Sequence, residues 1–168
     1  MKQPLVCLVL LAATLGFAQA GPAKSSNPFE GLHFLLGDWV GTGTGEPGEG
    51  SGGFSLKPEL NGQILVRRNF AEYPATKDGP AFRHEDVMNI FMEDGKLRAI
   101  YFDSEGHVIH YLITTEKDSA IFLSEGDGPR YRLTYQALDP TLISIKFEMA
   151  PPGGGEFKTY IQATAKRK

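Results

Sequence analysis

Three consecutive strand-like segments of the chain each carry, among their alternating side chains, a residue that can be charged. These residues are Asp86, Arg98 and His110, and their neighbours are mostly β-branched, aromatic or alternately polar and apolar, as is typical of β-strands. Groups of this kind on an apolar face bind acidic or hydrogen-bonding ligands, or transfer protons. The segments that carry them are 82–92, 97–103 and 107–116.

The turns between these segments fix which side chains share a face. The two turns read EDG (93–95) and SEG (104–106), and both fit a three-residue loop whose glycine takes the left-handed bulge position. This interpretation pairs Met92 with Lys96 and Asp103 with His107. It gathers on one face, which we expect to be the inner one, the residues His84, Asp86, Met88, Ile90, Arg98, Ile100, Phe102, Val108, His110 and Leu112.

Charges on an inner face need partners, because a buried unpaired charge is costly. One interpretation is structural: Asp86 pairs with Arg98 or Arg68, and His110 is a hydrogen-bonded core histidine. The other is that these groups converge on a ligand. Arg68 is included because it shares a face with apolar neighbours. The candidate ligand-binding residues are Arg68, His84, Asp86, Met88, Arg98, Phe102 and His110.

Catalytic and metal-binding motifs are not evident. An enzyme with His84 or His110 as base beside Asp86 is the alternative to a binding protein. His107 and His110 are three positions apart on a strand and so face opposite sides, which argues against a shared metal. The hairpin that carries Asp103 is expected to be exposed, with His107 as its surface partner. We therefore predict no catalytic residue and no metal ligand.

A short helix followed by a strand precedes these segments. Asn27 and Pro28 form a helix start signal, and Gly37 fits the position that ends a helix. From Asp38 the pattern alternates, with Trp39 on one side together with glycines 41, 43 and 45.

Strand-like segments joined by short turns fill the rest of the chain. About ten strands without a crossover helix predict an all-β fold, an antiparallel up-and-down barrel closed at one end by the short N-terminal helix. A two-layer sandwich is the alternative. The expected strands are 39–44, 54–60, 63–73, 82–92, 97–103, 107–116, 119–125, 130–138, 142–149 and 157–165.

The run GDWVGTGTG (37–45), preceded by FLL, resembles the opening of lipocalin-like (calycin) β-barrels, and among these the nitrobindin-like and related bacterial secreted families. The resemblance implies that Trp39 packs across the closed end of the barrel. It also raises haem as a cofactor, since nitrobindin-like barrels bind haem through a histidine near the last strand. Here that strand has no histidine and only Tyr160 as a substitute ligand, so we predict no cofactor.

The N-terminus has the pattern of a secretory signal peptide. Lys2 precedes the apolar run 5–15, and Ala18-Gln19-Ala20 fits a cleavage site. The expected domains are a signal peptide (1–20), a flexible tether (21–28) and one barrel (29–168). The only cysteine, Cys7, lies inside the signal, which excludes disulfides and thiolate sites in a processed chain.

Charge and patterning narrow the partners. The net charge of −3 disfavours nucleic acid as a partner, because proteins that bind nucleic acid need a basic surface. No second apolar run is long enough to span a membrane. We expect an exported, periplasmic or secreted, binding protein for a small, largely apolar ligand with an acidic group. A periplasmic enzyme, a haem-binding barrel and a structural domain with a filled interior are the alternatives.

Overall fold

The structure is a computed structural model, and it describes residues 27–42, 51–77 and 79–168. These residues form ten strands and two short 3₁₀ helices. The elements are η1 (Glu30–Leu35), β1 (Gly37–Gly41), β2 (Ser51–Glu59), η2 (Leu60–Gly62), β3 (Ile64–Tyr73), β4 (Phe82–Glu93), β5 (Lys96–Asp103), β6 (Val108–Glu116), β7 (Ser119–Ser124), β8 (Arg130–Asp139), β9 (Leu142–Ala150) and β10 (Lys158–Arg167).

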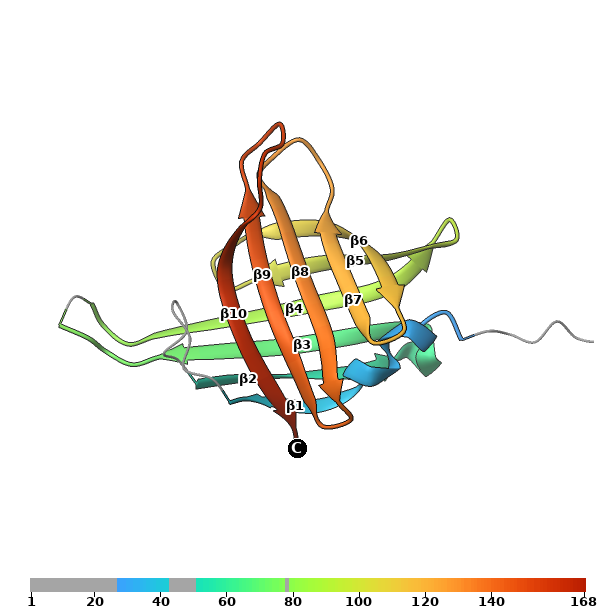
Figure 1. Ribbon diagram of the computed structural model, residues 1–168, viewed down its shortest axis with the longest axis horizontal. Helices are drawn as coiled ribbons and strands as arrows, with labels where there is room; N and C mark the ends of the chain where they lie inside the picture. The colour runs from blue at the N-terminus through green and yellow to red at the C-terminus, as the bar shows by residue number, and fades with distance from the viewer. Residues whose placement is uncertain (1–26, 43–50, 78) are drawn as a thin grey trace, which may run out of the picture.

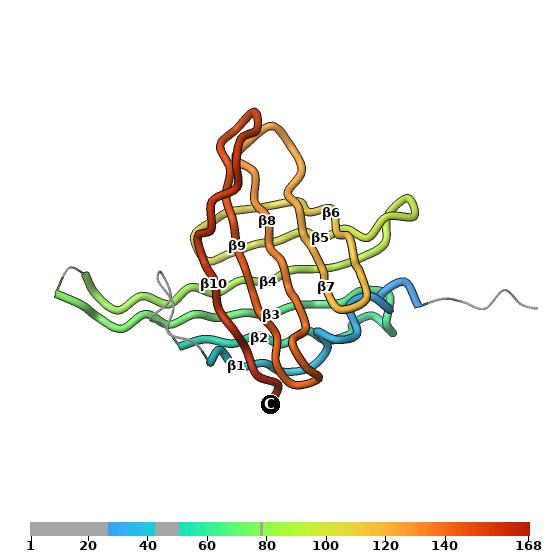
Figure 2. Tube along the Cα trace, in the orientation of Figure 1, coloured from blue at the N-terminus to red at the C-terminus, as the bar shows by residue number. Residues whose placement is uncertain are grey.

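The strands form a closed antiparallel barrel in chain order, in which each strand pairs with the next and β1 pairs with β10. The expected all-β, up-and-down barrel is confirmed, and the two-layer sandwich is excluded because no strand is left at an edge. Strands β7–β10 cross in front of β1–β4 at a steep angle (Figure 1). The hairpin between β3 and β4 continues beyond the barrel wall as a two-stranded arm (Figure 2).

The N-terminal turn η1 plugs one end of the barrel. It lies against β6 and β7 and buries Leu32 and Leu35 completely. The side chain of Asn27 accepts a hydrogen bond from the backbone N–H of Phe29 at 3.0 Å, so the expected start signal acts at this turn. The element is a 3₁₀ helix of six residues, in keeping with the short length of such helices.

Trp39 joins this plug to the barrel wall. Its indole Nε1 donates to the carbonyl of Leu35 at 2.9 Å. The guanidinium of Arg167 lies 4.4 Å from the centre of its ring and donates to the carbonyls of Phe34 and Leu36. The first and last strands and the plug thus meet at one buried aromatic ring, and the closed end is tied by side chains as well as by the ladder.

The turn between β4 and β5 differs from the expectation. Glu93 pairs with Lys96, so the loop has two residues, Asp94 and Gly95, and both have positive φ (49° and 72°). This is the geometry of a tight hairpin with two left-handed positions, which the sequence Asp-Gly favours. The next turn follows the expectation, since Phe102 pairs with Val108.

The predicted register between β4 and β5 was therefore wrong by one residue. A one-residue slip moves every later side chain to the other face. The inner face of β4 was predicted correctly, but β5 and β6 present the opposite set to the interior, with Ala99, Tyr101 and Tyr111 inside.

Strand β3 was also assigned the wrong inner face. Leu65 and Arg67 are buried inside the barrel, whereas Arg68 is exposed. The apolar residues on the outer face of β3 misled the prediction. One of them, Phe70, lies under the guanidinium of Arg83 at 4.8 Å, so it is covered by a neighbour and not by the core.

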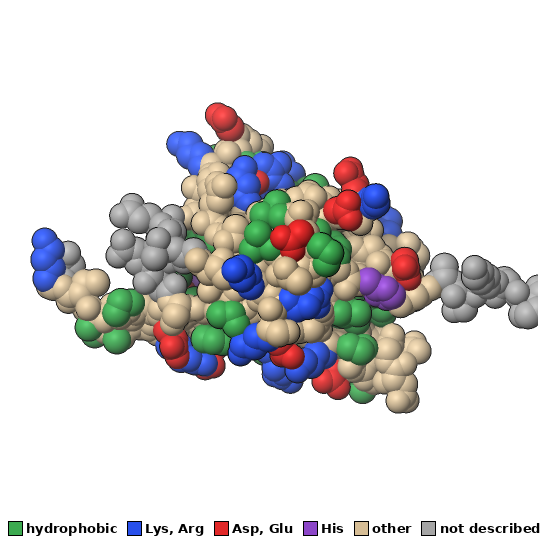
Figure 3. Space-filling view, turned by 60° about the horizontal axis from the view of Figure 1, so that its bottom comes forward, with side chains coloured by type: hydrophobic (Ala, Val, Ile, Leu, Met, Phe, Trp, Pro, Cys, Tyr) green, Lys and Arg blue, Asp and Glu red, His purple; other side chains and the backbone are tan. Residues whose placement is uncertain are grey.

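The expected signal peptide and residues 21–26 of the tether lie outside the described residues, as do glycines 43 and 45. None of the helices in the described ranges is long and apolar enough to cross a membrane. On the face shown in Figure 3, acidic and basic side chains are interspersed.

Candidate functional site

Aromatic side chains fill the closed half of the barrel. Trp39 stacks on Phe54 with ring centres 6.0 Å apart, and Phe54 packs on Tyr135 at 5.6 Å. Edge contacts continue from Tyr135 through Phe122 to Tyr111. All five side chains are buried, so this half of the barrel is core.

The open half differs in the exposure of its inward-facing side chains. Ile109, Tyr131, Phe147 and Ile161 continue the inner faces of their strands, and all four are only partly buried. Tyr131 and Phe147 stack on each other with ring centres 5.9 Å apart. One end of the barrel is therefore closed by η1, and partly exposed apolar side chains lie at the other end, which we call the mouth.

A network of charged side chains runs from the packed half toward the opening. Arg67 and Asp86 form an ion pair of 2.5 Å (Nη2 to Oδ1), with their side chains only 9% and 3% exposed. The other terminal nitrogen of Arg67 donates to the hydroxyl of Tyr135. The second oxygen of Asp86 accepts from Asn69 at 2.8 Å. The two buried charges are therefore paired, which offsets the free-energy cost of removing them from water.

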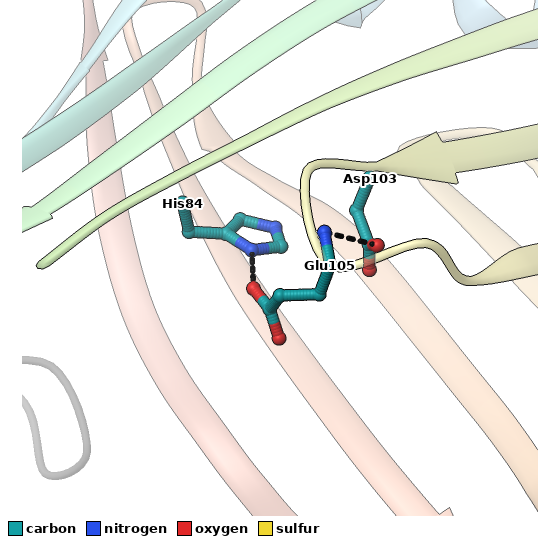
Figure 4. Close-up of side chains that lie close together, drawn as sticks. All are labelled: His84, Asp103 and Glu105. Atoms are coloured by element: carbon teal, nitrogen blue, oxygen red, sulfur yellow. Dashed lines mark hydrogen bonds and ion pairs between the residues drawn. The ribbon is translucent and has the colours of Figure 1, made fainter.

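His84 continues this network toward the solvent. Its Nε2 lies 3.3 Å from Oδ2 of Asp86 and 3.2 Å from the hydroxyl of Tyr101. Its Nδ1 lies 2.6 Å from Oε1 of Glu105, as the close-up shows (Figure 4). The imidazole thus bridges a buried carboxylate and an exposed one.

Asp103 completes the cluster at the turn between β5 and β6. Its Oδ1 accepts the backbone N–H groups of Glu105 and His107 at 3.0 and 2.9 Å. Its Oδ2 lies 2.8 Å from Nδ1 of His107 and accepts from Tyr101 at 3.2 Å. The expected pairing with His107 is confirmed. The expected exposure of Asp103 is wrong, because its side chain is only 4% exposed.

The neighbouring carboxylates determine the protonation state of His84. Hydrogen bonds that the His84 ring donates, to Asp86 first and also to Glu105, outweigh burial and raise the pKa of His84 to about 9. Burial opposes ionisation of Asp86, but the Arg67 charge and the hydrogen bonds from His84, Arg67 and Asn69 hold its pKa below the usual value. At neutral pH His84 is therefore an imidazolium, which can donate a proton but cannot act as a base.

The structure brings together only some of the predicted site residues. His84, Asp86 and Met88 follow one another along the inner face of β4. The other four lie on the outside: Arg68 and His110 are exposed, Phe102 is 43% exposed, and Arg98 pairs with Glu93 and Glu125. Their expected inward direction was wrong because of the two errors in facing described above.

Sequence reasoning missed Arg67, Tyr101, Asp103 and Tyr135 as members of the polar cluster. The sequence did contain a signal for Arg67. A buried Asp86 needs a cation as its partner, and of two adjacent arginines on a strand one must face inward. Tyr101 and Asp103 were given to the outer face by the one-residue slip. Tyr135 was correctly predicted to lie on the barrel wall, but its bond to Arg67 has no local signal in the sequence.

A shallow pocket of about 600 Å³ lies on the arm beside this cluster. Stacked rings of Tyr73 and Phe82, 6.1 Å apart, form part of it. Phe82 precedes His84 on the same face of β4, so the pocket adjoins the charged cluster. The pocket is lined by Ser51, Glu72, Tyr73, Pro74, Ala81, Phe82 and Arg83.

Two of the four histidines border the charged cluster: His84 contacts Asp86 and Glu105, and His107 contacts Asp103. The other two lie elsewhere, His33 in η1 within 3.6 Å of Glu30 and His110 on the outer face. Tyr160, the substitute ligand considered for haem, is half exposed and packs its edge against Phe147. Within residues 27–42, 51–77 and 79–168, donor atoms that could hold a metal ion come together at His84, Asp103 and Glu105.

Comparison of the chain with known protein families and with curated proteins finds no match. What the cluster does must therefore follow from its own geometry.

Proposed function

We propose that this chain is an exported protein of the lipocalin-like kind that binds a small, largely apolar molecule in the open half of its barrel. The observation that carries the proposal is the change along the barrel from fully buried to partly exposed inward-facing side chains. Tyr131 and Phe147 pack against the core on one side and are partly exposed on the other, so they are placed to contact an apolar molecule at this end of the barrel. An apolar cavity with a few converging polar groups is the usual form of a ligand site.

The apolar body of the ligand would contact the mouth and the adjoining arm. Tyr131 and Phe147 offer a stacked aromatic wall, and Tyr73 and Phe82 offer a second one on the arm. Aromatic faces of this kind bind flat or aliphatic groups through area and dispersion. A pocket of about 600 Å³ suits a molecule of ordinary metabolite size.

The polar group of the ligand would meet His84 and Glu105. The expectation of an acidic group rested on Arg68, Arg98 and His110, which lie on the outer surface, so the proposal does not retain it. Glu105 is exposed and accepts hydrogen bonds, and the imidazolium of His84 donates them. A hydroxyl group can use both partners at once.

Fluorescence titration with N-phenyl-1-naphthylamine, an uncharged aromatic probe, tests this proposal. We compare Phe147→Ala with Phe102→Ala, because the same side chain is removed from the mouth in one variant and from the outer face in the other. Loss of one aromatic contact is worth roughly 1.5 kcal/mol, or about tenfold in Kd. We expect that weakening for Phe147→Ala only.

Saturable binding must occur in the unaltered protein, and circular dichroism must show both variants folded. If the probe does not bind, or if Phe102→Ala weakens it as much as Phe147→Ala does, the open half of the barrel is not the binding site. Native mass spectrometry of protein purified gently from its own host would then identify the natural ligand.

A further inference from the structure

The cluster in the mouth has the composition and spacing of a metal site. We propose that His84, Asp103 and Glu105 bind one divalent first-row transition-metal ion, with Zn²⁺ as the representative. One donor atom from each residue lies within 4.8 Å of the others. His84 comes from β4, Asp103 from the end of β5 and Glu105 from the turn that follows (Figure 4).

Metal binding requires two adjustments. The donor atoms, now within 4.8 Å of one another, must take the spacing of a metal site, and Asp103 must give up one of its present hydrogen bonds. Zinc–nitrogen and zinc–oxygen bonds of about 2.0–2.2 Å place donor atoms on one ion roughly 3–3.6 Å apart. The 2.6 Å contact between Nδ1 of His84 and Oε1 of Glu105 would open slightly to admit the ion. Glu105 is exposed and can turn about its own side-chain bonds, so the backbone need not move.

The hydrogen-bond partners of His84 on its buried side also favour metal binding. Its Nε2 faces Oδ2 of Asp86 at 3.3 Å, and Asp86 is held in turn by Arg67 at 2.5 Å and Asn69 at 2.8 Å. Metal-binding histidines usually donate their second ring N–H to a carboxylate, which fixes the ring and makes the other nitrogen a better donor. Here that other nitrogen is Nδ1, which points to Glu105.

The charges of the cluster favour a dication. The carboxylates of Asp86, Asp103 and Glu105 carry three negative charges, and Arg67, paired with Asp86, carries one positive charge. A divalent ion bound by a neutral His84 ring brings the sum to zero. The ion would occupy the same two side chains, His84 and Glu105, that the proposed function offers to the polar group of the ligand, but the charge balance itself does not require the ligand.

The donor set selects the kind of ion. One imidazole nitrogen with two carboxylate oxygens suits Zn²⁺, Mn²⁺ or Fe²⁺, whereas Mg²⁺ and Ca²⁺ prefer oxygen donors throughout. Three protein ligands leave at least one position for water, which is the pattern of open zinc sites. That position would face the mouth of the barrel.

Isothermal titration calorimetry of the purified protein with ZnCl₂ tests the site. We expect one Zn²⁺ per chain, at least about tenfold weaker binding in Glu105→Gln, and no binding at this site in His84→Gln. His110→Gln is the matched control, because it removes an exposed histidine from the outer face, and it should bind as the unaltered protein does. MgCl₂ should give no stoichiometric heat.

Glu105 is exposed, so its substitution leaves the fold intact and keeps the test meaningful even if His84→Gln proves unstable. The proposal is overturned if the unaltered protein takes up no stoichiometric Zn²⁺, or if Glu105→Gln binds it with unchanged affinity. It is equally overturned if His110→Gln loses the ion, because the site would then lie elsewhere. Probe binding in the mouth, measured separately, distinguishes this failure from failure of the proposed function.

Discussion

The ion pair between Arg67 and Asp86 makes the sharpest stability prediction. Removing one member of a buried pair costs about 3–5 kcal/mol, because the other charge is left in an apolar interior. Arg67→Met leaves Asp86 with hydrogen bonds from Asn69 and His84, so we expect the lower end, about 3 kcal/mol. Asp86→Asn keeps an oxygen that can accept from Arg67 but leaves the buried Arg67 charge without a counter-ion beside the Tyr135 hydroxyl, and we expect about 4 kcal/mol.

The double variant contains no buried charge at this place. We therefore expect it to cost less than the sum of the two single variants, by about 3 kcal/mol of coupling. Domains of this size unfold at a cost of about 5–15 kcal/mol, so each single change should shift the urea midpoint visibly. Urea unfolding followed by tryptophan fluorescence reports on the fold directly, since Trp39 is buried in the barrel.

Arg68→Met is the matched control, since the neighbouring residue is exposed and faces the other side. It should change stability by no more than about 0.5 kcal/mol. Our reasoning is refuted if Arg67→Met costs no more than this control, or if the two single effects simply add, because neither result is compatible with a buried, coupled pair.

Two further changes test close packing and charge. A Cβ at Gly53 would lie 2.5 Å from the carbonyl oxygen of Trp39, so Gly53→Ala should lower the free energy of unfolding by about 1–3 kcal/mol, measured by thermal unfolding. Gly128→Ala is the control, because a Cβ there meets open space, and it should cost far less. Equal effects would contradict the close approach of β1 and β2. Glu148 is 5% exposed and accepts from Arg132 at 2.7 Å, and this bond, outweighing burial, lowers its pKa. Its contribution is therefore fully present above the unfolded pKa of about 4.3 and is lost as pH falls through the lower folded pKa. Glu148→Gln should cost about 2 kcal/mol at pH 7 and progressively less in acid, and a difference from the unaltered protein that does not vary with pH would count against this assignment.

The architecture could be predicted from sequence because it depends on features that are local and repeated. Alternation of side chains and short turns specify antiparallel strands, and ten of them in chain order close naturally into a barrel. The end signals of η1 and the burial of Trp39 are equally local. The inward faces of β8 and β9 were clear because Tyr131, Leu133 and Tyr135 alternate with polar residues.

The site could be predicted only in part because it depends on register. The turns EDG and SEG look alike in sequence, yet Asp94 takes a left-handed conformation and shortens the first turn by one residue. That single choice moved Arg98 and His110 outside and brought Tyr101 and Asp103 in. The Asp-Gly pair of the first turn does favour the two-residue form, but both turns also fit the three-residue pattern, and strand pairing across the sheet decides between the two.

The bond between β1 and β10 has a consequence for how the chain folds. Trp39 and Arg167 are register partners although almost the whole described chain lies between them, and such distant pairings form late and slowly. Until the residues 158–167 have been made, β1 and β9 each present an unpaired edge, which is a template for association with other chains. Folding of this barrel is therefore completed only with its last strand, and chains that stop short of it should aggregate and not merely unfold.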